Sequence, residues 1–581
     1  MKTKELNTKE KSLSSGEVKR HMLTGAEAVV RCLLEEGVDL IFGYPGGAIM
    51  PVYDALYDYQ KECKHILTRH EQGAIHAAQG YARSSGKVGV CLATSGPGAT
   101  NLITGIADAQ IDSTPLVCIT GQVHAHLLGT DAFQETDVVG ISMPVTKWNC
   151  QVTRAEDIPA ALAKAFYIAR SGRPGPVLVD ITKDAQFGMF EFEYHPCKQV
   201  RSYVAKPKLD MTKVIEAALL INQAQKPLVV FGQGVTLAGA EKEFTAFIEK
   251  ANLPAAWTIM GLSALPTEHP LNVGMLGMHG NYAPNKLTNE CDVLIAVGMR
   301  FDDRVTGNLE KYAKQAKVVH LEIDPAEIDK NVKTDVAVIA DCKESLAAIV
   351  PLLESNLNTA WLHQFKDLKR VEHLKVIDQE THPQHGELTM GEVITKINTI
   401  TKGEAIVVTD VGQHQMVACR YAAFAKTKSM ITSGGLGTMG FCLPAAIGAK
   451  FGMPQRQVIA VIGDGGFQMT IQELGTIFQT QIEVKILILN NQFLGMVRQW
   501  QDLFFDKRYS ATEMMNPDFQ TIAKGYGIPS QQVNDRDRLE EAVQEMLAHK
   551  GSYLLEVMVG KENNVFPMVE TGASVSDIRL E

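Results

Sequence analysis

Two short apolar runs near the C-terminal end of the chain each stop at a cluster of polar residues. Residues 458–462 (VIAVI) lead directly into Gly-Asp-Gly at 463–465, and residues 484–489 (VKILIL) lead directly into Asn-Asn at 490–491. Apolar, β-branched runs of this length are typical of buried parallel strands, whose carboxyl ends open into a binding crevice. The 24 residues between the two motifs leave room for one helix and one return strand. The pattern therefore predicts neighbouring strands that bring a carboxylate and a carboxamide to one sheet edge.

Oxygen ligands at a sheet edge suit a hard divalent cation that holds a diphosphate. Asp464 and Asn491 supply such oxygens, and glycines near them let backbone amides approach phosphate closely. Alone, the Gly-Asp-Gly turn favours a plain strand–turn–helix with a capping aspartate, because such short patterns match loosely. We expect the helix after it to begin near Thr470. The asparagine pair follows after room for one helix and one return strand, so it should lie beside the aspartate. This favours a metal site with a phosphorylated ligand.

The bulk composition narrows the classes of function that the chain can serve. Its 581 residues exceed what one hydrophobic core supports, which predicts about two to four domains. The net charge of −10 argues against nucleic acid as a partner, because nucleic-acid binders present basic surfaces. The ten cysteines include no Cys-x-x-Cys pair, which suits a reducing compartment and gives no zinc signal. Since no apolar run approaches the length of a membrane span, no membrane partner is expected.

The first 20 residues are hydrophilic and mixed in charge. They lack the apolar stretch of a signal peptide, and their glutamates argue against a transit peptide. We therefore expect residues 1–20 to form a flexible N-terminal tail and the protein to be cytoplasmic.

Strand-like and helix-like segments alternate along the remaining chain in three blocks, 21–190, 211–345 and 389–565, followed by an irregular C-terminal tail at 566–581. The apolar runs that we expect to form strands, besides the two above, are 40–42, 88–92, 116–119, 177–181, 227–231, 293–297, 318–323, 405–409 and 553–557. Such alternation predicts an α/β fold of three domains, each with a mainly parallel sheet flanked by helices.

The paired motif resembles the signature of thiamine-diphosphate-dependent enzymes. The resemblance implies that Asp464, Asn491 and the backbone carbonyl of Phe493 bind Mg²⁺, together with two diphosphate oxygens and a water. Arg-His-Glu at 69–71, followed by Ala-Gln-Gly-Tyr-Ala at 78–82, resembles the glutamate region of the same family. It implies that Glu71 hydrogen-bonds a ring nitrogen of the cofactor and promotes its activation. By itself, Glu71 would be interpreted as a helix N-terminal carboxylate, which the helix dipole favours.

Further motifs in the same order narrow the resemblance to the catalytic subunit of acetohydroxyacid synthase (acetolactate synthase). They include Thr-Ser-Gly-Pro-Gly-Ala-Thr-Asn at 94–101, Ser-Gly-Gly-Leu-Gly-Thr-Met-Gly at 433–440 and Gly-Met-Val-Arg-Gln-Trp-Gln at 495–501. The residues that the resemblance places at thiamine diphosphate are Gln122, close to the reacting carbon and counted as catalytic, and Gln413, His414, Gly437, Met439, Gly463, Gly465 and Gly466. The residues that it places around the 2-ketoacid substrates are Phe133, Lys147, Arg304 and Trp500. Without the resemblance, Trp500 would fit a core aromatic and Arg304 a surface ion pair.

The middle block carries a separate resemblance, to the FAD-binding domain of the same enzymes. A glycine-rich turn, Phe-Gly-Gln-Gly-Val at 231–235, follows an expected strand, although a lone Gly-x-Gly is a weak signal. The motifs at 276–280, 298–304 and 321–325 strengthen it. The residues that the resemblance implies as flavin contacts are Gly232, Gly234, His279, Arg300 and Asp324.

The resemblance implies a reaction in which pyruvate loses carbon dioxide on thiamine diphosphate and its hydroxyethyl unit joins a second 2-ketoacid. Pyruvate as acceptor gives 2-acetolactate, and 2-ketobutyrate gives 2-aceto-2-hydroxybutyrate, for branched-chain amino-acid biosynthesis. It also implies a homodimer or tetramer with active sites at the subunit interface, and a small regulatory subunit as a probable partner.

Three alternatives stay open at this point: a flavin- and thiamine-dependent pyruvate oxidase, a noncatalytic paralogue, and a flavin-free catabolic acetolactate synthase. Intact Glu71, Asp464 and Asn491 argue against the second, and the middle-block motifs argue against the third. The chain departs from the family at Trp148, where histidine is common, and at Phe493, where some members carry Arg, His or Glu. A tryptophan at 148 is expected to alter packing near the flavin and the channel mouth.

Overall fold

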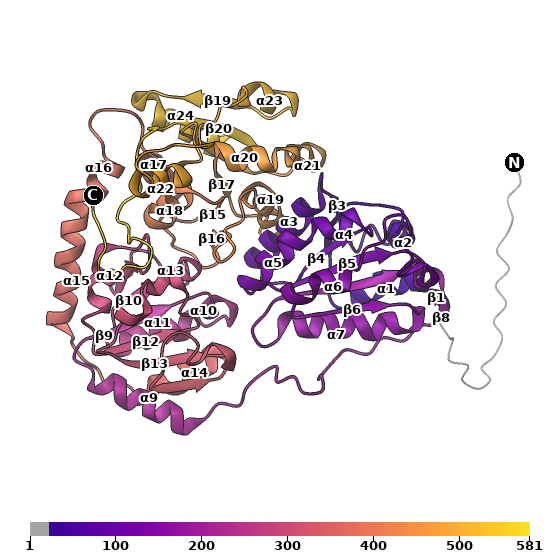
Figure 1. The fold of residues 1–581 in the computed structure, drawn as a ribbon, viewed down its shortest axis with the longest axis horizontal. Helices are drawn as coiled ribbons and strands as arrows, with labels where there is room; N and C mark the ends of the chain where they lie inside the picture. Colours follow the sequence, from indigo (N-terminus) through magenta and orange to yellow (C-terminus); the bar gives the residue numbers. More distant parts are fainter. Residues whose placement is uncertain (1–21) are drawn as a thin grey trace, which may run out of the picture.

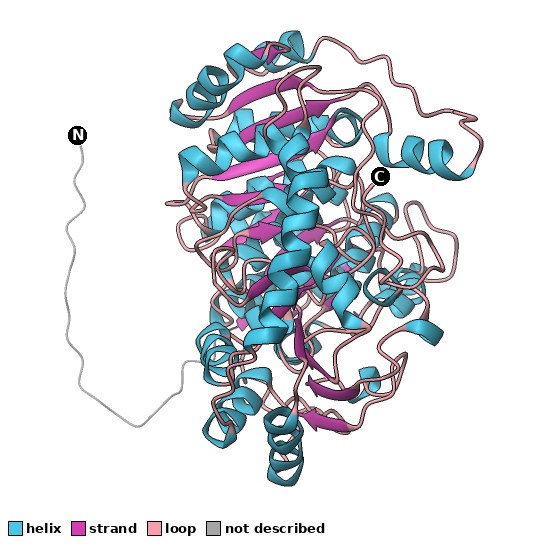
Figure 2. Ribbon diagram, turned by 90° about the vertical axis from the view of Figure 1, so that its left-hand side faces the viewer, coloured by secondary structure: helices cyan, strands magenta, loops and turns pink. Residues whose placement is uncertain are grey.

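The computed structural model describes residues 22–581, which form three α/β domains (Figure 1). Each domain contains a six-stranded sheet in which every strand pair is parallel. Helices lie on both sides of the strands (Figure 2). Each connection between two parallel strands runs back over one face of the sheet, usually as a helix. The predicted fold class is confirmed. The tail predicted at 1–20 lies outside the described residues.

The first domain, indigo to purple in Figure 1, contains the sheet β3-β2-β4-β5-β7-β6. Its strands are β2 (Leu40–Gly43), β3 (Lys64–Leu67), β4 (Gly89–Ala93), β5 (Leu116–Gln122), β6 (Trp148–Val152) and β7 (Pro176–Thr182). Its helices are α1 (Gly25–Glu35), α2 (Met50–Asp58), α3 (Glu71–Ser85), α4 (Pro97–Asn101), α5 (Ile103–Ile111), α6 (Val138–Ser142), α7 (Ile158–Arg170) and α8 (Lys183–Phe187). A separate antiparallel pair joins β1 (Met22–Thr24) to β8 (Met189–Glu191).

The central domain contains the sheet β11-β10-β9-β12-β13-β14. Its strands are β9 (Pro227–Phe231), β10 (Ala255–Trp257), β11 (Asn272–Met275), β12 (Val293–Val297), β13 (Lys317–Glu322) and β14 (Val336–Ile339). Its helices are α9 (Met211–Gln223), α10 (Gly234–Leu237), α11 (Glu241–Lys250), α12 (Tyr282–Thr288), α13 (Asp303–Thr306) and α14 (Cys342–Ile349). The helices α15 (Thr359–Glu372) and α16 (Asp378–Thr381) then lead to the third domain.

The third domain contains the sheet β16-β15-β17-β18-β20-β19. Its strands are β15 (Ile406–Thr409), β16 (Met430–Ile431), β17 (Val458–Gly463), β18 (Lys485–Asn490), β19 (Ser530–Val533) and β20 (Tyr553–Met558). Its helices are α17 (Met390–Thr401), α18 (Gln413–Tyr421), α19 (Cys442–Gly452), α20 (Asp464–Met469), α21 (Leu474–Thr480), α22 (Gly495–Phe504), α23 (Phe519–Gly525) and α24 (Arg536–Ala548).

The strand orders divide the domains into two kinds. Numbered within each sheet along the chain, the first and third domains share the order 2-1-3-4-6-5, whereas the central domain has the order 3-2-1-4-5-6. The latter is the order of the dinucleotide-binding α/β fold, whose ligand lies where strands 1 and 4 meet. Here these are β9 and β12, and the predicted flavin turn directly follows β9.

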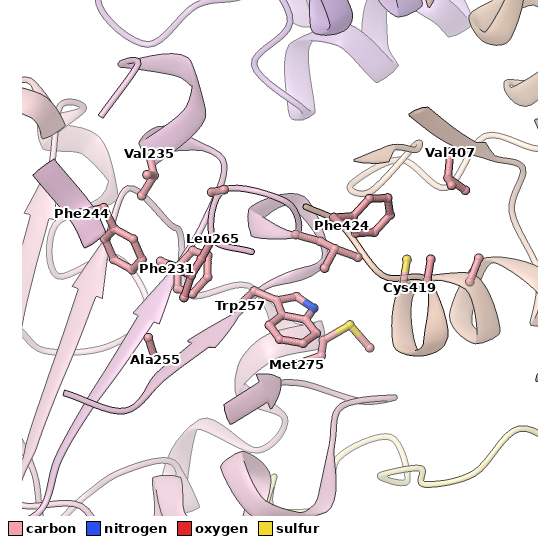
Figure 3. Close-up of a cluster of buried hydrophobic side chains, with 14 of the residues drawn as sticks. Phe231, Val235, Phe244, Ala255, Trp257, Leu265, Met275, Val407, Cys419 and Phe424 are labelled. Atoms are coloured by element: carbon pink, nitrogen blue, oxygen red, sulfur yellow. The ribbon is translucent and has the colours of Figure 1, made fainter. Parts of the chain in front are cut away.

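The central and third domains share one continuous apolar core (Figure 3). Trp257 and Met275 of the central domain belong to the same buried cluster as Cys419 and Phe424 of the third. The first domain has clusters of its own on either face of its sheet. The central and third domains are therefore joined by apolar burial, which resists separation.

The helix after Gly-Asp-Gly begins earlier than the sequence pattern predicts. The prediction of a start near Thr470 is wrong, because α20 begins at Asp464, directly where β17 ends. A carboxylate in the first turn of a helix is favoured by the helix dipole, so the aspartate can begin the helix itself. Thr470 (φ −133°) is where α20 stops, before a short 3₁₀ turn at Ile471–Glu473.

The C-terminal tail at 566–581 contains no helix or strand, yet part of it is buried against the central domain. The amide of Val569 donates to the Met278 carbonyl, and Ser574 forms an isolated bridge with Gly307. Among the helices of residues 22–581, none combines the length and apolar character needed to cross a membrane.

Candidate active site

The two polar clusters of the opening motif meet at one edge of the third sheet. Asp464 follows β17 and Asn491 follows β18, and these strands pair in parallel register with Gly463 opposite Leu489. Because parallel strands end at the same edge, the predicted juxtaposition of carboxylate and carboxamide is confirmed.

A small cavity of about 50 Å³ lies against this edge. The predicted residues that line it are Gln413, His414, Met439, Gly463, Asp464, Gly465, Gly466, Asn491 and Phe493. One pocket thus gathers the three residues expected to bind the metal and six of the eight expected at thiamine diphosphate.

The walls of this pocket contain features that suit a phosphate group. His414 is buried, which lowers the pKa of its imidazole to about 3, and its Nε2 has no hydrogen-bond partner among the described residues. A Cβ at Gly463 would lie 2.8 Å from His414 Nδ1, and a Cβ at Gly495 would lie 2.2 Å from Gln413 Oε1. The glycines therefore keep the space open, and the unpartnered ring nitrogen is a donor or acceptor left for a ligand.

The carboxylate of Asp464 is held by a residue that the sequence pattern did not single out. Asn516 Nδ2 donates to Asp464 Oδ2 at 2.7 Å and contacts Asn490 Oδ1 at 3.1 Å. Burial raises the pKa of Asp464 to about 6, against the opposing effect of the Asn516 hydrogen bond. Asn491 is oriented by its own bonds, since Nδ2 donates to Gln413 Oε1 at 3.2 Å and Oδ1 accepts from the Phe493 amide at 3.2 Å. A buried carboxylate of this kind is the type of group that a divalent cation stabilises in its charged form.

A second, much larger cavity of about 820 Å³ lies between the domains. Its lining includes Gly232, Gly234, His279 and Arg300 from the flavin prediction, and Arg304, Trp500, Gly437 and Met439 from the substrate and thiamine predictions. Both cavities are lined by Val411, Gly412, Met439, Met496 and Val497. The predicted flavin region, the substrate residues and the phosphate pocket therefore adjoin one another within a single chain.

The end of the large cavity that is predicted to hold a flavin lies at the switch point of the central sheet. The Gly234 amide donates to the Gly298 carbonyl at 2.9 Å, and a Cβ at Gly234 would lie 2.5 Å from Gly298 Cα. His279 is buried, which lowers the pKa of its ring to about 4, and its Nδ1 has no partner among residues 22–581. Predicted Asp324 does not line the cavity, whereas neighbouring Glu322 does, with a pKa that burial raises to about 7. Glu322 ends β13, at the same sheet edge as the glycine-rich turn that follows β9.

The substrate end is bounded by an aromatic wall and a cation. Trp500 on α22 packs against Phe504 with ring centroids 5.0 Å apart, and it lines the large cavity. Arg304 also lines it, and its guanidinium is mostly exposed, with Nη1 3.4 Å from the Met278 sulfur. An exposed guanidinium at a cavity wall is available to a carboxylate ligand.

Two other residues predicted to bind the 2-ketoacid line neither cavity. Phe133 is 88% exposed. Lys147 Nζ donates to the carbonyls of Ile168 at 2.5 Å and Ser171 at 2.8 Å, so it holds the end of α7. Their roles at substrate stay predictions.

The two residues predicted to be catalytic also lie outside both cavities. Glu71 is buried at the first position of α3, where its Oε2 accepts from Asn101 Nδ2 at 2.9 Å. Gln122, at the end of β5, is fully buried and donates to Asp180 Oδ2 at 3.2 Å. Within one chain, the structure therefore does not bring Glu71 and Gln122 together with Asp464.

Trp148, the departure expected near the flavin, lies instead at the start of β6. Its ring carries the Lys164 ammonium at 4.2 Å from the centroid and packs against the core of the first domain. It does not line the large cavity, so the expected effect on packing there is not seen.

Comparison with known proteins finds relatives over nearly the full length of the chain. Three family models match in order: thiamine pyrophosphate enzyme, N-terminal TPP binding domain, at residues 23–141; the central domain at 214–349; and the C-terminal TPP binding domain at 410–557. The chain is 48% identical to the acetolactate synthase isozyme 2 large subunit of Escherichia coli K12, over 96% of this chain and 99% of that protein. It is 44% identical to a probable acetolactate synthase large subunit of Methanocaldococcus jannaschii, over 96% and 95%. It is 45% identical to the acetolactate synthase large subunit of Corynebacterium glutamicum, over 96% and 90%.

Proposed function

Because the chain belongs to the acetolactate synthase large-subunit family of thiamine-pyrophosphate enzymes, we propose that it condenses pyruvate with a second 2-ketoacid at the cavity described above. Its enzyme class is a thiamine-diphosphate-dependent acetolactate synthase. The observation that carries the proposal is the continuity between the phosphate pocket at Asp464 and the cavity walled by Arg304 and Trp500.

The phosphate pocket fits thiamine diphosphate held through a magnesium ion. Asp464, Asn491 and the Phe493 carbonyl would be the protein ligands of Mg²⁺, whose preference for oxygen matches all three. The unpartnered His414 nitrogen and the open glycines would receive the diphosphate. When bound, the cofactor supplies the electron sink that makes decarboxylation of a 2-ketoacid possible. Gly437 and Met439, beside the pocket, would hold its aminopyrimidine ring.

The large cavity would receive the second 2-ketoacid at its Trp500 end. Arg304 would bind the substrate carboxylate through charge-assisted hydrogen bonds. The Trp500 ring would form an apolar wall against the acceptor's alkyl group, which excludes water and favours an acceptor with one more carbon. We infer that both pyruvate and 2-ketobutyrate serve as acceptors, as branched-chain amino-acid biosynthesis in the cytoplasm requires.

The position of Glu71 supports an active site shared between two copies of the chain. Glu71 and Gln122 line neither cavity of their own chain, so a partner's first domain would have to supply them. The first domain also exposes large apolar side chains, with Phe133 at 88%, Met143 at 63% and Met50 at 50%. Exposed apolar groups in such number are typical of a surface that another protein covers. We therefore propose a homodimer or a tetramer with its active sites at the subunit interface.

A flavin and a regulatory subunit complete the proposal. The central strand order, the close approach of Gly234 to Gly298 and the unpartnered His279 nitrogen support FAD binding in the large cavity. The relatives are named as large subunits, which supports a small partner subunit for this chain as well.

The test is product identification. Purified chain is incubated with pyruvate, thiamine diphosphate and Mg²⁺, with and without 2-ketobutyrate and FAD. We expect acetolactate from pyruvate alone and 2-aceto-2-hydroxybutyrate when 2-ketobutyrate is added. Acetate with hydrogen peroxide as the main products would instead identify a pyruvate oxidase. A folded chain that binds no FAD under these conditions would contradict the proposed flavin site.

A further inference from the structure

The segment 433–440, which carries Gly437 and Met439 to the cavity, lies where all three domains meet. A Cβ at Gly434 would lie 2.3 Å from the Met260 sulfur, and a Cβ at Gly435 would lie 2.9 Å both from Arg300 Nη2 and from Asp112 Oδ1. Met260 and Arg300 belong to the central domain, and Asp112 follows α5 of the first domain. Gly434 and Gly435 therefore leave no room for a side chain, and this end of the loop is held by groups of the other two domains.

Two buried aspartates of the first domain bind the loop directly. Asp112 accepts from the Gly434 amide through Oδ2 at 2.9 Å and from the Gly435 amide through Oδ1 at 2.7 Å. Asp108, one helical turn earlier, accepts through Oδ1 from the Ser433 hydroxyl and, at 3.0 Å, from the Thr438 hydroxyl. Both carboxylates are almost fully buried. Four donors of the loop thus end on carboxylates that belong to another domain.

Arg83 on α3 supplies the positive charge that buried carboxylates need. Its Nη2 lies 2.8 Å from Asp112 Oδ2, with both side chains almost wholly buried. Its Nη1 donates to the Thr432 carbonyl, at the start of the loop, and its Nε donates to Thr114 Oγ1 at 3.0 Å. The helices α3 and α19 pack side by side at this boundary (Figure 1). Arg83 therefore links the aspartates to the same segment of the third domain.

The third domain holds the far end of the same segment in a matching way. Asp410, at the end of β15, accepts from the amides of Gly440 and Cys442 at 3.0 Å each. Three buried carboxylates thus hold the beginning, the middle and the end of the segment. Leu436, Gly437 and Met439, between these anchors, line the large cavity.

We propose that Asp108, Asp112 and Arg83 are positioning residues that set the loop 433–440 for the thiamine ring, so that each first domain supports the cofactor site of its own chain. This rests on the proposed function, in which Gly437 and Met439 hold the aminopyrimidine. In the shared-site arrangement, the same first domain offers Glu71, at the opposite end of α3 from Arg83, to the partner's site. One first domain then contributes to two active sites. It positions the loop in the site of its own chain and supplies Glu71 to the site of the partner chain.

The structure predicts different outcomes for matched substitutions at the two aspartates. Asp112→Asn would place an amide donor against Arg83 or a loop amide, and Asp108→Ala would remove the acceptor for two hydroxyls. Each should raise the dissociation constant for thiamine diphosphate about 10- to 100-fold. Asp108→Asn can keep Oδ1 in place, because Asp108 Oδ2 has no partner among the described residues. It should therefore bind the cofactor within about threefold of wild type. Tyr81→Phe, also on α3, removes only the bond to Asp39 and is the control.

The experiment measures cofactor affinity by calorimetry, the near-ultraviolet circular dichroism of the bound cofactor, and amide exchange at 434 and 435 without cofactor. We expect weakened binding, an altered dichroism band and faster amide exchange in Asp112→Asn and Asp108→Ala, with Tyr81→Phe unchanged. Wild-type affinity, dichroism and exchange in both variants would overturn the proposal. Should they fail to fold, Ser433→Ala and Thr438→Val remove the donors to Asp108 instead, with the same expectations and the same contrary result. If the wild-type chain makes no acetolactate, the proposed function is wrong. The cofactor affinity and amide exchange of the variants still test whether the aspartates position the loop.

Discussion

The first and third domains have the same strand order, and each carries polar residues where its strands end. In the third domain these residues, Asp464 and Asn491 among them, line a pocket of their own chain. In the first domain, Gln122 ends β5 but is fully buried and bonded to Asp180, and Glu71 begins α3 outside both cavities. The same topology therefore gathers the predicted residues in one pocket in the third domain but not in the first.

The difference comes from what each sheet edge faces. The third domain shares its apolar core with the central domain, and its sheet edge opens toward the large cavity between them. The first domain contacts the rest of the chain through α3, which packs against α19, and through the end of α5, which binds the third-domain loop at 433–440. Phe133 and its neighbours remain exposed. A strand order thus determines where polar residues gather, and the neighbouring surface determines whether they make a site.

The largest expected effect is at Glu71, the carboxylate that the first domain would supply to the active site of a partner chain. Glu71→Gln keeps the size of the side chain and its contact with Asn101, but it removes the ionisable group. Turnover should fall by about 100-fold or more, while thiamine diphosphate still binds. Acetolactate formation and cofactor binding are measured on the same preparation. Near-normal turnover would refute the role assigned to Glu71.

Mixing two inactive chains tests whether the site is shared. A dimer of one Glu71→Gln chain and one Asp464→Ala chain contains one intact site only if Glu71 acts on the partner's cofactor. Random mixing should then restore about a quarter of wild-type activity, since half of the dimers are mixed and each has one good site. If both residues act within one chain, co-expressed or refolded mixtures should stay inactive.

The next largest effect is expected at the proposed metal site of the third domain, where two residues should differ in how strongly they affect cofactor binding. Asp464→Ala removes a proposed ligand and should abolish magnesium-dependent binding of thiamine diphosphate. Asn516→Ala removes the group that orients this carboxylate at 2.7 Å and should weaken binding about 10- to 100-fold. Titration with Mg²⁺ at fixed cofactor distinguishes the two. Equal and small effects would mean that this edge does not hold the metal.

A smaller effect is expected at the wall of the substrate cavity. Trp500→Leu shortens the apolar surface that would contact the acceptor's alkyl group. The ratio of 2-aceto-2-hydroxybutyrate to acetolactate, at equal concentrations of the two acceptors, should fall about 10-fold. Phe504→Leu is the control, because Phe504 supports the Trp500 ring but does not line the cavity. An unchanged product ratio in Trp500→Leu would place the acceptor elsewhere.

The smallest effect concerns Lys147, a first-domain residue that lines neither cavity and holds the end of α7. Burial, with help from Arg173 and against Asp324, lowers the pKa of Lys147 to about 8 from 10.5. Between these two values the unfolded chain binds more protons, so this group makes the folded state more stable as pH rises. Lys147→Met should remove that rise in the free energy of unfolding, measured with urea across this pH range. Tyr203→Phe, which loses one bond to the ammonium, should keep it. A pH dependence that is the same in Lys147→Met and wild type would contradict the assignment.

Much of the fold could be predicted because strands and helices are encoded locally. The expected runs at 227–231 and 293–297 coincide with β9 and β12, since short apolar runs bounded by turns have few other structures open to them. The helix start at Asp464 was missed because a glycine-rich turn resembles a loop in sequence, although its aspartate can begin a helix. The domain boundaries at 190, 211, 345 and 389 stay predictions.

The meeting of Asp464 and Asn491 follows from the sequence alone, because consecutive parallel strands end at a common edge whatever surrounds them. The glycine-rich turn proposed for the flavin could also be found in the sequence, since a glycine after a strand has a local signature. Only the tertiary structure showed that Asn516 holds Asp464, that Asp108 and Asp112 hold the loop at 433–440, and that Glu71 lies outside the cavity of its own chain. Those relations join segments up to several hundred residues apart, and such contacts leave no periodicity or spacing in a single sequence.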